Sequence, residues 1–171
     1  ESLRNFVAAV LTSYNVPKED SQIVADVLVT ADLMGIESHG VQRLKRYTTG
    51  IQVGSVNPKA NIKVVSESAS TALVDGDSGL GQVVAYKAME IAVKKADGVG
   101  VSVVGVRNSH HFGIAGYYAL QAVKRNMIGI VMTNSEALVA YTYSVGRNVG
   151  TNPIAVGFPT KKPPPVLFDA A

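Results

Sequence analysis

The sequence predicts an α/β fold, in which an N-terminal helical segment, residues 1–55, precedes a mixed sheet with flanking helices, residues 56–171. Two observations support this fold class. Apolar residues recur at helical spacing through the first third of the chain, and from about Asn61 short β-branched runs alternate with helical stretches. Alternating strands and helices are typical of α/β layers with some parallel pairing. A composition of 47% hydrophobic and 17% charged residues suits a packed core and argues against disorder.

Three helices are expected in the first segment. The first carries one apolar stripe, formed by Leu3, Phe6, Val7, Val10, Leu11 and Tyr14. The second begins near Pro17 and ends near Gly35, with a stripe formed by Ile23, Val24, Val27, Leu28 and Ala31. The third and shorter helix is expected to begin at Ser38, a favoured N-cap residue, and to end before "GSVNP". Its apolar side consists of Val41, Leu44, Tyr47 and Ile51.

The second segment alternates strands with helices. The helices are expected at residues 81–98 and 114–126, and the strands at residues 61–65, 71–76, 99–106, 127–134, 154–158 and 166–170. The β-branched run "VGVSVVGV" at 99–106 predicts a buried strand. The last strand would have a bare edge, so we expect either a covering element or, preferably, a longer protein of which this chain is a part.

Composition narrows the function classes. The absence of cysteine excludes a disulfide framework and thiolate chemistry, and suits a cytoplasmic protein. No apolar run approaches the roughly 18–20 residues of a membrane span. The net charge of +3 is mild, and Lys and Arg are scattered through the sequence. We therefore expect no membrane and no nucleic acid among the partners, and a small anionic molecule is compatible with this charge.

The glycines do not form a standard nucleotide-binding motif. "VDGDSGLGQVV" joins a predicted strand to a predicted helix, but its glycines, Gly76, Gly79 and Gly81, do not have the G-x-G-x-x-G spacing of a Rossmann dinucleotide site. The Walker pattern is also absent. Any nucleotide that binds here is held in neither of these two ways.

The first candidate site includes one of three histidines. His39 stands at the start of the third predicted helix, and Arg43 and Tyr47 follow at four-residue steps, which predicts one helix face. Such a face offers a proton-transfer group, a guanidinium fork for a carboxylate and a hydroxyl. The alternative is a capping residue with two solvated side chains, and these three residues taken alone favour that alternative.

The other two histidines are adjacent. In "RNSHHFGIAGYY", His110 and His111 would face opposite ways on an extended backbone, so we expect one functional and one solvated imidazole. Three histidines without cysteine or a nearby acidic cluster make a poor zinc site, and we expect no metal. The nucleophile elbow G-x-S-x-G of a hydrolase is absent.

Two Thr-Asn pairs lie at strand boundaries, Thr133–Asn134 and Thr151–Asn152. Small polar side chains at strand ends could contact the amide or the ribose of a cofactor. They are equally ordinary turn residues, and composition alone favours that interpretation.

Three motifs together are similar to a known family. "SHGVQRLKRY", "RNSHHFGIAGYY" and "GTNPIAVGFP" resemble the type-2 malate/L-lactate dehydrogenases, a family that includes sulfolactate and ureidoglycolate dehydrogenases and cyclic-imine carboxylate reductases. The resemblance extends over essentially the whole chain. It implies an oxidoreductase that uses NAD or NADP, a non-Rossmann fold and a homodimer of chains about twice as long. It also implies hydride transfer between nicotinamide and a small 2-hydroxy or 2-oxo acid.

The resemblance also implies residue roles. His111, before Phe-Gly, matches the catalytic histidine, whereas His110 occupies a variable position. The substrate contacts implied for the carboxylic acid are Ser38, His39, Arg43 and Tyr47. The cofactor contacts expected are Asn134, Ser135, Thr151, Asn152, Asp169, Ala170 and Ala171. Residues 1–55 would thus form the substrate side and residues 56–171 an incomplete cofactor-binding domain.

Two departures from the family pattern affect these assignments. Tyr143–Ser144 replaces a Gly-Gly pair, and the threonine of the D-x-A-T motif would follow the last residue of the chain. The alternative to an enzyme is a non-catalytic binding or assembly module that represents half of such a protein.

Overall fold

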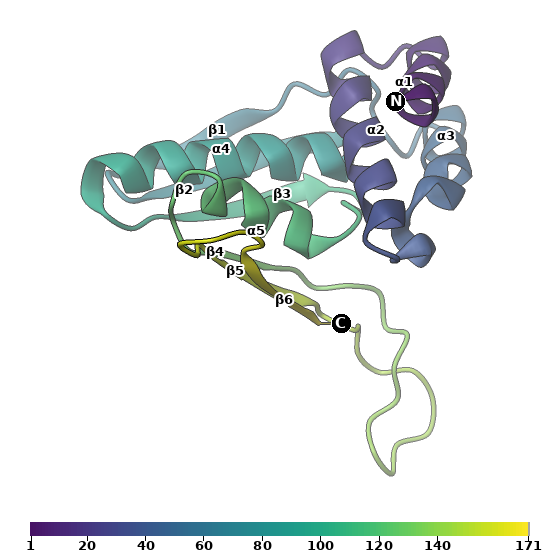
Figure 1. The fold of residues 1–171 in the computed structure, drawn as a ribbon. Helices are drawn as coiled ribbons and strands as arrows, with labels where there is room; N and C mark the ends of the chain where they lie inside the picture. The colour runs from purple at the N-terminus through teal and green to yellow at the C-terminus, as the bar shows by residue number, and fades with distance from the viewer. Residues whose placement is uncertain (171) are drawn as a thin grey trace. The chain divides into compact units, whose positions relative to one another are not determined.

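The computed structural model describes residues 1–170, so the predicted cofactor contact at Ala171 lies outside the described residues. The fold is α/β, as predicted (Figure 1). Contacts divide the chain into two compact units, Glu1–Ile114 and Ala115–Ala171. The functional division at residues 55 and 56 stays a prediction. Within residues 1–170, none of the helices combines the length and the hydrophobicity that a transmembrane span needs.

Three α-helices form the N-terminal part of the first unit, as expected. They are α1 (Ser2–Ser13), α2 (Lys18–Leu33) and α3 (Leu44–Gln52). The predicted stripes are buried at Val7, Leu11, Val24, Val27, Leu28 and Ala31, but Leu3 and Phe6 of the α1 stripe are 44% and 59% exposed, so the prediction is wrong at these two positions. Most of these side chains pack in one cluster with Tyr47, Leu80 and Val83. Each large aliphatic side chain buried in this way contributes about 1.5–3 kcal/mol to stability.

The prediction that the third helix begins at Ser38 is wrong. Two 3-10 turns, η1 (Glu37–His39) and η2 (Val41–Arg43), precede α3, and Gly40 between them has an extended backbone. The carboxylate of Asp32 accepts the Val41 N–H at 3.0 Å and occupies the space beside Gly40, so a tertiary contact from α2 replaces the helical one. His39 and Arg43 consequently lie on separate turns and not on one helix face.

The first unit contains a mixed three-stranded sheet in the order β1-β2-β3. Strand β1 (Lys63–Glu67) pairs antiparallel with β2 (Thr71–Gly79), and β2 pairs parallel with β3 (Val103–Ser109). Helix α4 (Gly81–Val99) connects the parallel strands and packs on both of them. This βαβ arrangement confirms the parallel pairing expected from the alternating pattern.

The expected burial of the strand at residues 99–106 is wrong. The strand begins later, and all its residues except Val104 are exposed, with Val103 66% and Val106 42% accessible. The physical reason is the strand order, since β3 is an edge strand of this sheet. A β-branched run reflects strand propensity, and this propensity does not specify how many layers cover the strand.

The second unit packs one helix on an antiparallel sheet. Helix α5 (Ala115–Val123) contacts β4 (Gly129–Met132), β5 (Ile154–Phe158) and β6 (Val166–Ala170), which are ordered β4-β5-β6. Gly129 and Gly157 are partners in the register and face this helix. A Cβ on Gly129 would collide with the backbone oxygen of Ala119, so glycine is needed for the close approach of helix and sheet.

The side of this sheet that faces away from α5 is apolar and exposed. We call it the apolar sheet face, and its members are 41–65% accessible: Ile130, Met132, Ile154, Phe158, Val166 and Phe168. The register places Met132 opposite Ile154 and Phe158 opposite Val166, which makes the surface continuous across three strands. Between β4 and β5 the chain makes a long exposed loop, with one isolated bridge between Val139 and Val149.

Candidate functional site

The two adjacent histidines follow β3, and their backbone passes directly over the start of α4. Gly81 is the first residue of α4, and a Cβ at this position would collide with the backbone oxygens of His110 and His111. Glycine therefore permits the contact that fixes this loop against the helix. His110 then bonds through Nε2 to the carbonyl oxygen of Ser55 at 2.8 Å, so the two neighbouring imidazoles have different partners.

His111 is the centre of a cluster of side chains within the first unit. Its Nδ1 lies 2.8 Å from the Tyr47 hydroxyl and 3.4 Å from the backbone N–H of Gly113. The His39 ring stacks on it, with the ring centroids 5.4 Å apart and the planes inclined by 25°. Tyr47 is 3% exposed, so the hydroxyl that faces His111 belongs to a side chain that is otherwise part of the hydrophobic core.

The surroundings keep His111 neutral. Its pKa is lowered from 6.5 to about 4, mainly by burial and then by electrostatic repulsion from Arg46, His39 and Arg43, in that order. Burial also raises the pKa of Tyr47 to about 12, although the Gln82 amide and the two arginines act in the opposite direction. Near neutral pH the pair is thus an uncharged imidazole hydrogen-bonded to a protonated phenol.

The structure brings three of the four predicted substrate residues, His39, Arg43 and Tyr47, to His111. Ser38 joins them indirectly, because its hydroxyl lies 3.0 Å from Nδ1 of His39. The Nε of Arg43 donates to the Ser38 carbonyl at 2.6 Å, which holds the two 3-10 turns together.

Sequence reasoning missed Arg46. Its guanidinium has a larger effect on the His111 pKa than that of Arg43. The signal was present in the sequence, since residues 43, 46 and 47 follow the i, i+3, i+4 spacing of one helix face. Gln82 was missed as well, and nothing in its local sequence distinguishes it from a surface glutamine.

Three predicted cofactor residues form a hydrogen-bonded group in the second unit. The backbone N–H of Ser135 donates to Oδ1 of Asn152 at 3.1 Å, and the backbone N–H of Thr151 donates to Oγ of Ser135 at 2.9 Å. The hydroxyls of Ser135 and Thr151 are 3.2 Å apart. Asn134 is exposed beside them, with its carbonyl accepting the Thr133 hydroxyl at 3.0 Å.

Asp169 and Ala170 lie on β6 rather than on that loop. The Asp169 carboxylate accepts the backbone N–H of Gly116 at 2.8 Å, in the first turn of α5, where a negative charge is favourable. Ala170 pairs with Ile154 of β5. The exposed hydroxyls and amides of this unit are donors and acceptors of the kind that a ribose or a carboxamide requires, so the residues present fit a nicotinamide nucleotide.

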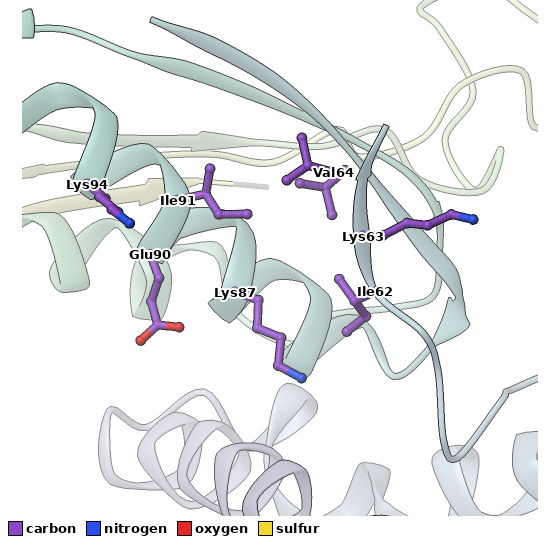
Figure 2. Close-up of a pocket in the computed structure, with 8 residues that line it drawn as sticks. Ile62, Lys63, Val64, Lys87, Glu90, Ile91 and Lys94 are labelled. Carbon is purple, nitrogen blue, oxygen red and sulfur yellow. The ribbon is translucent and has the colours of Figure 1, made fainter. Parts of the chain in front are cut away.

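A separate hollow lies between β1 and α4 (Figure 2). Its floor is apolar, formed by Ile62, Val64, Val74 and Ile91, and lysine side chains surround it. Lys87, one of these lysines, already pairs with Asp20 at 3.2 Å. None of the predicted site residues lines this hollow, and we assign it no role in the candidate site.

Comparison with known proteins identifies the family of the chain. The sequence profile of the malate/L-lactate dehydrogenase family matches residues 1–171. The malate dehydrogenase of Pyrococcus abyssi is 58% identical over 171 residues, which are 100% of this chain and 47% of that protein. The L-sulfolactate dehydrogenase of Methanocaldococcus jannaschii is 51% identical over 162 residues, which are 95% of this chain and 47% of that protein.

The fold has the same relatives. The structure of malate dehydrogenase from Pyrococcus horikoshii superposes with a TM-score of 0.96 at 57% identity, over 99% of this chain and 48% of that one. This chain therefore spans about half the length of the relatives it matches. Because the family profile extends over every residue and the relatives share both sequence and fold, the chain belongs to the malate/L-lactate dehydrogenase family.

Proposed function

We propose that the protein containing this chain is an oxidoreductase that uses NAD or NADP and transfers a hydride between the nicotinamide and a small 2-hydroxy or 2-oxo acid. Malate, lactate and sulfolactate and their oxo acids are the candidate substrates. The main support is the neutral imidazole of His111, hydrogen-bonded to Tyr47 and influenced by two guanidinium groups. The names of the relatives, malate dehydrogenase and L-sulfolactate dehydrogenase, support the same class of reaction.

His111 is proposed as the acid and base at the C2 oxygen of the substrate. A bound nicotinamide supplies the hydride acceptor for oxidation and the hydride donor for reduction. The imidazole takes the hydroxyl proton during oxidation and returns a proton during reduction. Substrate binding assists this role: an anion beside Arg43 and Arg46 offsets two of the charges that lower the His111 pKa, so the imidazole holds a proton more readily in the complex.

The two arginines also favour a particular acid. Arg43 and Arg46 present two guanidinium charges close to His111, and a guanidinium binds a carboxylate or a sulfonate through paired hydrogen bonds. We therefore propose that acids with two anionic groups, such as malate and sulfolactate, bind better than lactate. Ser38 and His39 would orient the substrate from the 3-10 turns.

The cofactor is proposed to contact the second unit. Ser135, Asn134, Thr151 and Asn152 would supply hydrogen bonds to its ribose or carboxamide, with Asp169 and Ala170 nearby on β6. We also propose that the cofactor-binding fold is not a Rossmann fold. The sheet of this unit is antiparallel throughout, whereas a Rossmann unit needs parallel strands and a glycine fingerprint. The homodimer expected from the family resemblance is part of the same proposal.

The test follows NAD(P)H absorbance in the full-length protein with oxaloacetate, pyruvate and sulfopyruvate. His111→Ala should lower kcat by about 10²–10⁴, because the reaction loses its acid and base, while the KM for cofactor should change little. His110→Ala is the matched control and should remain near wild type. The assignment fails if His110→Ala is the inactive variant. Absence of turnover with every acid, together with no cofactor binding by fluorescence, would instead support a non-catalytic module.

A further inference from the structure

The two 3-10 turns that carry Ser38, His39 and Arg43 have little to hold them within their own sequence. We call residues 37–43 the substrate turns. Each turn is three residues long, and neither is capped by the side chain of its own N-cap residue. None of their residues is buried in the part of the chain that the structure describes, and Val41 packs only partly against the core cluster. Short 3-10 turns have poor hydrogen-bond geometry, so a contact from another element is needed to fix them.

The carboxylate of Asp32 provides this contact. Its Oδ2 accepts the N–H of Val41, the first residue of η2, at 3.0 Å. An amide at the start of a helical turn has no partner inside that turn, and a negative charge beside it is favourable. Asp32 is the penultimate residue of α2, whose Leu28 and Ala31 are fully buried, so the carboxylate is held by a helix that is fixed in the core.

The position of Asp32 is unfavourable for its own helix. Aspartate is a poor helix former, and the C-terminal end of a helix disfavours negative charge. The contact also requires glycine at position 40. The backbone of Gly40 is extended and open to any residue, but a Cβ there would collide with the Asp32 carboxylate. A residue that is unfavourable in its own helix and excludes a side chain from its neighbour is explained by the turns that it holds.

The substrate turns connect this contact to the site. The Arg43 N–H donates to the Gly40 carbonyl at 2.9 Å, and the Arg43 Nε donates to the Ser38 carbonyl at 2.6 Å. Because the second bond uses Nε, an acid can bind through the two terminal amino groups of the guanidinium. The Ser38 hydroxyl lies 3.0 Å from Nδ1 of His39, whose ring stacks on His111. Each of these contacts depends on the course of the same short backbone segment.

We propose that Asp32 is a positioning residue for the substrate: by binding the Val41 N–H beside Gly40, it fixes the substrate turns so that their side chains meet the acid together. The inference rests on the proposed function, because the acid defines what is positioned. Asp32 itself needs only to accept a hydrogen bond. Asparagine can therefore replace it, and alanine cannot.

The test uses Asp32→Ala and Asp32→Asn in the full-length protein with oxaloacetate or sulfopyruvate. Asp32→Ala should raise the KM for the acid about tenfold, the lower end of the effect of one hydrogen bond to a charged group. It should lower kcat less than threefold and leave the Kd for NAD(P)H unchanged, because His111 and the cofactor contacts are intact. Asp32→Asn should keep the KM within about threefold of wild type. Asp26→Ala is the matched control: it removes another carboxylate of α2, which accepts Nε of Arg4 at 2.8 Å, and should change Tm without changing the KM.

A second pair of variants tests the contact between Asp32 and Gly40. Gly40→Ala should raise the KM about as much as Asp32→Ala, because the new methyl group displaces the carboxylate from Val41. In the Asp32→Ala background the same methyl group has room, so Gly40→Ala should add less than about twofold there. Two independent changes would instead multiply to about a hundredfold, and that result would refute the inference.

Hydrogen exchange reports on the substrate turns independently of activity. The peptide that spans residues 37–43 is followed by mass spectrometry in the protein without substrate. Its exchange should be faster in Asp32→Ala than in wild type, Asp32→Asn or Asp26→Ala, because only that variant releases the turns.

The outcomes separate this inference from the proposed function. If wild type turns over an acid but Asp32→Ala lowers only Tm, or if Asp32→Asn raises the KM as much as Asp32→Ala, Asp32 only stabilises the fold and the inference is refuted. If wild type turns over no acid, the proposed function fails. The exchange rates then still decide whether Asp32 holds the turns, and equal rates in Asp32→Ala and wild type would refute it.

Discussion

Acidification should weaken the fold through His111, because the folded chain keeps this imidazole neutral. The folded pKa is about 4, below the ordinary value of 6.5 that the unfolded chain would show. Between these two values the unfolded chain binds a proton that the folded chain does not bind. The free energy of unfolding therefore decreases as the pH falls from 6.5 to about 4, and this contribution stays constant below that window.

The size of the effect follows from the two pKa values. The difference between 6.5 and about 4 corresponds to at most about 3 kcal/mol, at about 1.4 kcal/mol for each tenfold change in proton affinity. His111 is only partly buried, and solvent screens its surroundings, so we expect roughly 2 kcal/mol. Such a loss is a substantial fraction of the stability of a typical domain.

The measurement compares urea unfolding of wild type and His111→Asn at about pH 7 and about pH 4. Asparagine removes the titration, while its side-chain amide can still pair with the Tyr47 hydroxyl. Other titrating groups, such as Asp75 and Glu67, are common to both proteins and cancel in the comparison. Between pH 7 and pH 4, the free energy of unfolding of wild type should decrease by about 2 kcal/mol more than that of the variant. An equal or smaller loss in wild type would refute the assignment of a neutral, desolvated imidazole.

Three further predictions concern the substrate, the packing and the cofactor. Arg46→Met should raise the KM for a dianionic 2-oxo acid about tenfold, measured from initial rates. Lys45→Met, which removes a charge from the neighbouring exposed residue, is the control and should leave this KM unchanged. Gly129→Ala should destabilise the protein by about 1–3 kcal/mol, since its Cβ meets the backbone of α5. Gly98→Ala in α4, with no atom within 4 Å, should stabilise it by about 0.5–1 kcal/mol, and thermal melts compare the two. Ser135→Ala should raise the Kd for NAD(P)H several-fold in fluorescence titrations without altering the KM for the acid.

The parts of the fold that depend on local periodicity could be predicted from the sequence. The stripe of α2 was correct because a helix buries residues that recur every three or four positions, whereas that of α1 was correct at Val7 and Leu11 but wrong at Leu3 and Phe6, which are exposed. The start of α3 was wrong because Asp32, from another helix, supplies the partner that local reasoning assigned to Ser38. The burial of β3 was wrong because strand order is a property of the whole sheet.

In the candidate site, too, residue identities could be predicted from the sequence, whereas contacts between distant residues could not. The family resemblance indicated His111, Arg43 and Tyr47, whereas the residues alone did not decide between His110 and His111. The bond between Tyr47 and His111 joins residues 64 positions apart, and no local rule predicts it. The low pKa of His111 depends first on burial, which arises only from the tertiary fold. Gln82 could not be identified because the sequence does not show whether a glutamine side chain is buried or solvated.

The apolar sheet face has a practical consequence for handling this polypeptide. Six large apolar side chains on three paired strands form one exposed hydrophobic surface. In water, a hydrophobic surface of this kind associates with other hydrophobic surfaces. A preparation of these 171 residues alone should bind the dye ANS strongly and precipitate as its concentration rises. Replacing Phe168 and Ile130 with lysine should reduce both tendencies, as dye fluorescence and light scattering would show.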